Sequence, residues 1–172
     1  MGDGENLSAA PSRVPPFVRK VHVVVAACAF LLAGTVAQAG ADHATNVERL
    51  LLNEINRVRI AKGLPTLGAD AQLRLAARAH SRDVLRRGVL THGSVGRRLQ
   101  SYGVRSKPIG EVIAWSAGRP VRARFIVAQW LASPPHRAIL LSRHFHRVGV
   151  GSAAGPFMGF RTADVLTADF AR

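Results

Sequence analysis

The sequence contains very little cysteine and few acidic residues. Cys28 is the only cysteine among 172 residues, which excludes a disulfide framework and any zinc site built from several thiolates. The chain has 10 acidic residues against 24 basic ones, so its formal net charge is +14. Hydrophobic residues make up 48% and charged residues 20%, which is typical of a globular protein and excludes wholesale disorder.

Lysine is also scarce. Lys20, Lys62 and Lys107 are the only lysines, so arginine carries almost all of the positive charge. An arginine excess suits a polyanionic surface such as nucleic acid or acidic lipid. A biased genome would produce the same excess, and the composition alone leaves both interpretations open.

Two common hydrolase signatures are absent from the sequence. It contains no His-Glu-x-x-His segment and no Gly-x-Ser-x-Gly segment. The first motif places two zinc ligands on one helix face, and the second presents a nucleophilic serine on a sharp turn. A hydrolase built on either pattern is therefore not indicated.

The first forty residues have the pattern of an export signal. Basic residues precede the apolar run 21–37, which ends in Ala37-Gln38-Ala39 and overlaps a second small-x-small site ending at Ala41. This order is typical of a cleaved secretory signal. We expect residues 1–39 to be a signal peptide, cleaved after Ala39 or Ala41, and residues 40–172 to form one domain that is secreted or periplasmic.

Two alternatives remain for this segment. The run 21–37 could be an uncleaved anchor, because it lies at the short end of the roughly 17–25 residues that span a bilayer. Residues 25–28 also resemble a lipoprotein box that would place a lipid on Cys28, although the apolar run continues beyond that cysteine. Export in any form makes anionic envelope lipids or wall polymers better partners than nucleic acid.

Helix boundaries are marked by local signals. Thr45 and Glu48 have the spacing of a capping box, in which two side chains satisfy the first free amides of a helix, and Gly63 suits its end. Asp70 is a good N-cap for a second helix, which we expect to end at Gly88. These signals predict two long helices in the first half of the domain.

Apolar periodicity predicts the remaining elements. We expect a short helix over 95–102, a helix over 121–131, and another that starts after Ser133 as N-cap. Predicted strands are 109–115, 147–151, 165–170 and, more weakly, 157–161. Helices followed mostly by strands predict an α+β fold with helices packed on an antiparallel sheet.

Two histidines and one acid are placed where they can carry chemistry. His92 follows a helix end, where a loop can present its ring to solvent. His136 is the third residue of a predicted helix, whose free amides and dipole favour a neutral imidazole able to bind metal. Glu111 begins an apolar strand, so it is either a site residue or the anchor of a buried salt bridge.

The other histidines are interpreted as structural. His80 lies on the apolar face of the second predicted helix, where we expect a core histidine bonded to the backbone. His144 and His146 lie among arginines and are expected at the surface.

Several short motifs occur in one characteristic order. They are Leu51-Leu52-Asn53-Glu54-Ile55-Asn56, Leu75-Ala76-x-x-Ala79-His80-Ser81, Leu90-Thr91-His92, Gly110-Glu111-Val112-Ile113-Ala114, Trp130-x-x-Ser133-Pro134-x-His136-Arg137, Val148-Gly149-Val150-Gly151 and Thr167-Ala168-Asp169-Phe170. Together they resemble the CAP superfamily of cysteine-rich secretory, antigen 5 and pathogenesis-related proteins (the SCP-like domain), in its cysteine-poor bacterial branch. The resemblance implies an α-β-α sandwich with a central antiparallel sheet between helical layers.

The resemblance also implies a cleft with two histidines and two acids, which binds a divalent cation in some members. It places the histidines at His92 and His136 and one acid at Glu111, whereas the second acid position is Ser133. A hydroxyl is a poor ligand beside a carboxylate. We therefore expect a metal such as zinc to be held weakly by His92, Glu111 and His136. Val112 also departs from the family, which usually has asparagine there.

Three functions are compatible with these observations. The first is a secreted module that binds a lipid or other small ligand in the cleft, with or without a divalent metal. The second is a basic adaptor that docks through arginine to anionic envelope lipid or wall polymer. The third is a metal-dependent hydrolase in which zinc activates water and Glu111 is base or ligand.

Overall fold

The computed structural model describes residues 44–117 and 120–172, which belong to one unit, 39–172. The expected signal peptide and its cleavage sites lie outside the described residues. The helices are α1 (Asn46–Ala61), α2 (Ala71–Arg87), α3 (Val95–Ser101), α4 (Ala123–Ala132) and α5 (Pro134–Leu140). The strands are β1 (Gly68–Ala69), β2 (Ile109–Ala117), β3 (Arg147–Phe157) and β4 (Phe160–Ala171). None of the described helices is long and apolar enough to cross a membrane.

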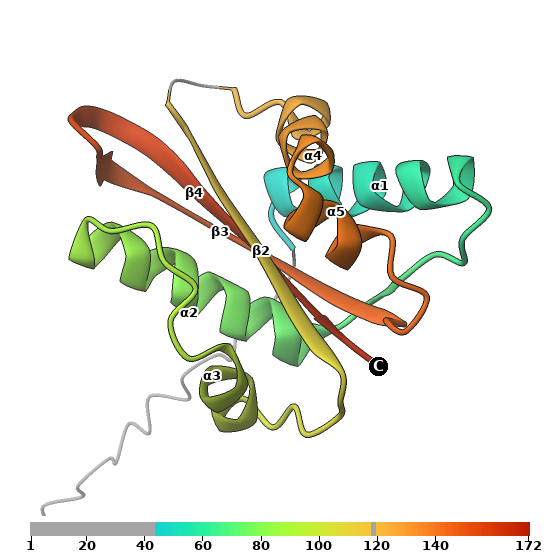
Figure 1. Cartoon of the computed structure of the whole chain (residues 1–172). Coiled ribbons are helices and arrows are strands. Elements are labelled where there is room, and N and C mark those ends of the chain that lie inside the picture. Colours follow the sequence, from blue (N-terminus) through green and yellow to red (C-terminus); the bar gives the residue numbers. More distant parts are fainter. Residues whose placement is uncertain (1–43, 118–119) are drawn as a thin grey trace, which may run out of the picture. The chain divides into compact units, whose positions relative to one another are not determined.

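One sheet lies between two groups of helices (Figure 1). Helices α2 and α3 contact one face, and α1, α4 and α5 contact the other. Successive side chains of β4 point to opposite faces, so Leu166 and Phe170 join the core under α1 and α4, whereas Val165 and Ala171 face α2 and α3. Burial on both faces confirms the predicted α-β-α sandwich.

The strand order is β1-β3-β4-β2, which leaves β2 at an edge of the sheet. Strands β2, β3 and β4 pair antiparallel, as predicted, but β1 pairs parallel with β3. The sheet is therefore mixed. Strand β1 is a two-residue bridge, too short for an apolar pattern to reveal.

The predicted separate strand over 157–161 is wrong. Met158 and Gly159 form the turn of the β3–β4 hairpin, with φ values of 50° and 84°. Apolar residues lie on both sides of this turn, so the composition of 157–161 is like that of a strand. A strand cannot continue through two successive positive φ angles, so the chain reverses there.

The predicted helix caps are confirmed at the first two helices. The Thr45 amide donates to Glu48 Oε2 at 2.8 Å, and the Glu48 amide donates to Thr45 Oγ1 at 3.3 Å. Asp70 Oδ1 accepts from the Leu73 amide at 2.9 Å, and Gly88 ends α2 with φ 68°. Ser133 precedes α5, but its side chain makes no capping hydrogen bond.

Two glycines of β3 allow α2 to lie directly on the sheet. A Cβ atom at Gly149 would come within 2.0 Å of the Arg74 amide nitrogen, and one at Gly151 within 2.1 Å of the Arg78 amide nitrogen. The helix backbone thus occupies space that any other residue would fill. This close approach fixes the height of α2 above the sheet, and with it the position of His80.

Candidate functional site

Two acids lie side by side on the face of the sheet that α2 and α3 cover. Glu111 on β2 is the register partner of Asp169 on β4. Both are buried, with relative exposures of 4% and 0%. Two adjacent buried carboxyl groups require a compensating cation or a shared proton.

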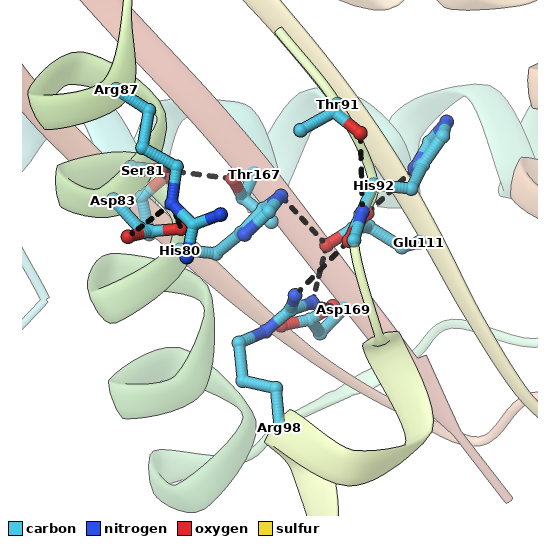
Figure 2. Close-up of polar contacts among 12 residues, drawn as sticks. His80, Ser81, Asp83, Arg87, Thr91, His92, Arg98, Glu111, Thr167 and Asp169 are labelled. Carbon is cyan, nitrogen blue, oxygen red and sulfur yellow. Dashed lines mark hydrogen bonds and ion pairs between the residues drawn. The ribbon is translucent and has the colours of Figure 1, made fainter. Parts of the chain in front are cut away.

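Arg98 supplies the cation. It extends from α3, and its Nη2 contacts Glu111 Oε2 and lies 2.9 Å from Asp169 Oδ1 (Figure 2). Its guanidinium is itself mostly buried, so the pairing is weakly screened by solvent. The sequence pattern does not single out Arg98 or Asp169 as site residues. One feature could have indicated Asp169 as a site residue, because it is an acid within an apolar strand.

His92 is bound to the same acid. Its Nδ1 lies 2.6 Å from Glu111 Oε1. When Glu111 is ionised it is an acceptor only, so this contact then favours the tautomer that donates from Nδ1 and leaves the lone pair on Nε2. The side chain is half-exposed, so that Nε2 can meet a ligand.

His136 approaches His92 from the opposite side of β2. The ring centroids are 6.2 Å apart, with an interplanar angle of 51°. Both histidines and Glu111 line a cavity of about 290 Å³ at the edge strand β2. We call this cavity the cleft, and its other lining residues are Val95, Ile109, Gly110, Pro135 and Ile139. The structure thus brings the three residues singled out in the sequence to one cavity.

Local features of β2 and α1 position His136. A Cβ at Gly110 would come within 2.8 Å of Phe145 and 3.2 Å of Ile139, so glycine lets the α5 segment approach β2 closely. The buried Arg59 donates from Nη1 to the carbonyls of Leu140 at 2.7 Å and Ser142 at 2.9 Å. These hydrogen bonds hold the end of α5 in place.

His80 completes the polar cluster. As expected it is buried and contacts the backbone, at Thr91, but its Nε2 also lies 3.6 Å from Glu111 Oε2. Burial, reinforced by the charge of Arg98, lowers the pKa of His80 to about 4. At neutral pH it is therefore an uncharged neighbour of the two acids.

Burial dominates the protonation of the acid pair. It raises the pKa of Glu111 to about 7 and that of Asp169 to about 8, although Arg98 opposes both shifts. In an unfolded chain both groups would lose their protons near pH 4. The folded domain therefore retains protons that the unfolded chain releases, and its stability falls as the pH rises through these values.

We expect the free energy of unfolding to fall by about 1–2 kcal/mol between pH 7 and 9. A histidine with an ordinary pKa of about 6.5 is mostly neutral in this range, so His80 contributes little to this change. Asp169→Asn keeps the shape of the side chain but removes one titrating group, and it should flatten the dependence. Urea unfolding of both proteins at pH 7, 8 and 9 measures it. Equal slopes in the two proteins would contradict the raised pKa of Asp169.

The fit of a metal ion to the cleft rests on the two imidazoles. With Zn–N bonds of about 2 Å, two rings on one ion have centroids at most roughly 6 Å apart. The observed 6.2 Å is just beyond that distance, so the two rings would have to move closer together to hold one ion. Residues 44–117 and 120–172 contain no group of three histidine, cysteine or acidic side chains arranged to hold a metal. Glu111 is better placed to orient His92 than to bind an ion directly, so the three-ligand site stays a prediction.

The two departures from the family pattern have different positions. Ser133 immediately precedes α5 and is not among the residues that line the cleft. Val112 is fully buried in the apolar core on the opposite face of the sheet from Glu111.

Comparison with known proteins identifies the family. Residues 52–165 match the model of the CAP, cysteine-rich secretory protein family. The uncharacterized protein YkwD of Bacillus subtilis (strain 168) is 31% identical over 109 residues, which cover 60% of this chain and 41% of YkwD.

Solved structures agree with this match. An extracellular protein containing an SCP domain from Bacillus anthracis str. Ames is 27% identical, with a TM-score of 0.58 over 73% of this chain and 40% of that one. An outer surface protein from Borrelia burgdorferi shares the fold, with a TM-score of 0.60 at 20% identity over 73% of this chain and 92% of its own. This chain thus spans about two-fifths of the first relatives in length. It belongs to the CAP family of cysteine-rich secretory proteins.

Proposed function

We propose that this chain is an exported CAP-domain protein that binds a small ligand in the cleft. The observation that carries the proposal is the convergence of His92, Glu111 and His136 on one cavity beside apolar side chains. At about 290 Å³ the cavity is at the small end of ligand pockets, so it suits a small molecule or the end of a lipid. Export is supported by the description of the solved relatives as extracellular and outer surface proteins.

The two histidines are the groups that would hold a divalent metal. Burial and the neighbouring His92 lower the pKa of His136, which favours the neutral ring that a metal requires. Glu111 would fix the orientation of His92 through the Nδ1 contact. A bound zinc ion would supply a Lewis acid that polarises a ligand oxygen.

A hydrolytic function has less support than binding. A general base needs a free carboxylate oxygen within reach of the attacking water. Both oxygens of Glu111 are engaged, one by His92 and the other by Arg98.

A zinc titration of the cleft tests the proposal. We expect calorimetry at pH 7.5 to find one zinc per chain in the wild type, and an affinity at least about tenfold lower in His92→Ala/His136→Ala, since both imidazole ligands are removed. His144→Ala/His146→Ala removes two histidines outside the cleft and is the matched control, which should bind zinc as the wild type does. Equal losses in the two double variants would place the zinc outside the cleft and remove the metal from the proposal.

Docking to an anionic envelope surface is a second candidate function. It is supported by exposed arginines and by a group of exposed apolar side chains at one end of the sheet. Retention on vesicles of equal parts phosphatidylglycerol and phosphatidylcholine should fall steeply as sodium chloride rises from about 50 to about 500 mM, because salt screens surface charges. No retention at low salt would eliminate this candidate.

A further inference from the structure

The turn between β3 and β4 exposes large apolar side chains. Met158 is 59% and Phe160 49% exposed, and Val89, just after the end of α2, is 55% exposed. Gly88 and residues 156–161 line one surface pocket at this turn. We call residues 157–160 the hairpin tip. Large apolar side chains gathered at a protruding turn indicate a surface that contacts something other than water.

The backbone conformation makes the methionine unusual. Met158 has φ 50° and Gly159 φ 84°, so both central residues of the turn are left-handed. Such turns strongly favour asparagine or glycine, because other residues are disfavoured at positive φ. The conformation of the turn therefore does not explain why residue 158 is methionine, and its exposed side chain needs another explanation.

The tip is held rigidly by aromatic packing. The Trp115 ring centroid lies 5.8 Å from that of Phe157 and 5.7 Å from that of Phe160. Phe157 itself is buried, so the exposed residues stand on a fixed base. A rigid apolar tip loses little conformational entropy when it is covered.

Arginines lie at the end of the domain that carries the tip. Arg161 follows it on β4, and Arg86 and Arg87 lie in the last turn of α2, next to Gly88. Arg86 and Arg87 share one acid, Asp83, and their side chains are 73% and 64% exposed. Arg86 and Arg87 share one carboxylate, so this pair keeps positive charge, and the exposed Arg161 adds to it beside the apolar side chains.

We propose that the hairpin tip inserts into the headgroup region of an anionic lipid bilayer. Met158 and Phe160 enter the apolar boundary, while Arg86, Arg87 and Arg161 contact lipid phosphates. Apolar insertion and arginine–phosphate attraction reinforce each other on such a surface. The inference deepens the docking function proposed above by naming the surface and its partner, and it does not depend on the cleft.

Protection of Met158 from oxidation tests the insertion. The sequence has two methionines, Met1 and Met158, so peptide mass spectrometry resolves them. Vesicles of equal parts phosphatidylglycerol and phosphatidylcholine should slow oxidation of Met158 in the full chain by dilute peroxide at least about fivefold, because the thioether is then shielded. Pure phosphatidylcholine vesicles should leave the rate unchanged.

A matched pair of variants separates the tip from total charge. Arg86→Gln/Arg161→Gln should restore the oxidation rate on anionic vesicles. Arg49→Gln/Arg57→Gln removes the same charge from α1 and should leave the protection intact. If anionic vesicles do not retain the wild type at all, the docking function itself fails. If they retain the wild type but Met158 oxidises as fast as in solution, the docking function stands and the proposed insertion of the hairpin tip is overturned.

A third variant separates binding from folding. Met158→Asn places a residue suited to positive φ in the turn, so the urea midpoint should stay the same or rise. The same variant should weaken the anionic-lipid-dependent part of vesicle binding about tenfold. Ile60→Asn removes another exposed apolar side chain, 63% exposed on α1, and should not weaken it. Undiminished binding by Met158→Asn would overturn the proposal.

Discussion

Alanine at Gly149 is expected to lower the free energy of unfolding by about 3 kcal/mol or more. The new Cβ would lie 2.0 Å from the Arg74 amide nitrogen and 2.1 Å from the Leu73 carbonyl carbon, both of which are backbone atoms of α2. The helix cannot relieve the overlap by a rotamer change, so it must move away from the sheet. Urea unfolding of Gly149→Ala measures the cost.

Gly155 on the same strand provides the control for this substitution. A Cβ there would meet Leu85 Cδ1 at 3.5 Å, which is an ordinary contact. Gly155→Ala should therefore change the free energy of unfolding by no more than about 0.5 kcal/mol. Similar effects at the two positions would show that α2 is not held by its close approach to β3.

Gly149→Ala should also change the pKa of His80. Displacement of α2 would move His80 away from Arg98 and Glu111 and expose its ring to water. Its pKa, which burial lowers to about 4, should then rise toward the ordinary value. An NMR titration of the His80 ring in folded Gly149→Ala measures this change, and Gly155→Ala should leave the pKa low.

Zinc binding to the cleft is expected to weaken at least about tenfold between pH 7.5 and 5.5. Metal requires neutral imidazole, and a histidine with an ordinary pKa of about 6.5 is mostly protonated at pH 5.5. Because burial and His92 lower the pKa of His136, that ring stays neutral to lower pH. The loss should therefore be smaller than the roughly hundredfold expected for two ordinary histidines.

Ser133→Glu is expected to tighten zinc binding by about tenfold. It places an anionic oxygen just before α5, near His136, where the family resemblance implies an acid. Calorimetric titration of wild type and variant at pH 7.5 and 5.5 checks both expectations. If neither protein binds zinc at pH 7.5, the cleft histidines do not form a metal site, and the docking function becomes the stronger candidate.

The ends of the first two helices could be predicted from the sequence because the interactions that stabilise these ends are local. The capping box joins Thr45 to Glu48, three residues away, and Asp70 caps Leu73 over the same distance. Gly88 ends its helix through its own positive φ. None of these interactions needs a distant part of the chain.

The hairpin turn shows where local composition fails. Apolar residues on both sides of Met158 suggest a continuous strand, but the turn conformation depends on how β3 and β4 pair. The parallel pairing of β1 with β3 is also a long-range feature, which Gly68 and Ala69 alone do not indicate.

The α+β class, the ends of the first two helices and, through the ordered motifs, the family could be predicted from the sequence. The same motifs singled out His92, Glu111 and His136, which the fold brings to one cavity. The place of Asp169 and Arg98 beside these residues, in contrast, depends on the packed fold. Strand register places Asp169 opposite Glu111, and α3 brings Arg98 between them. Capping hydrogen bonds join residues that are close in the sequence, so a local motif predicts them. The protonation of a buried acid depends instead on partners that only the packed sheet and helices bring together.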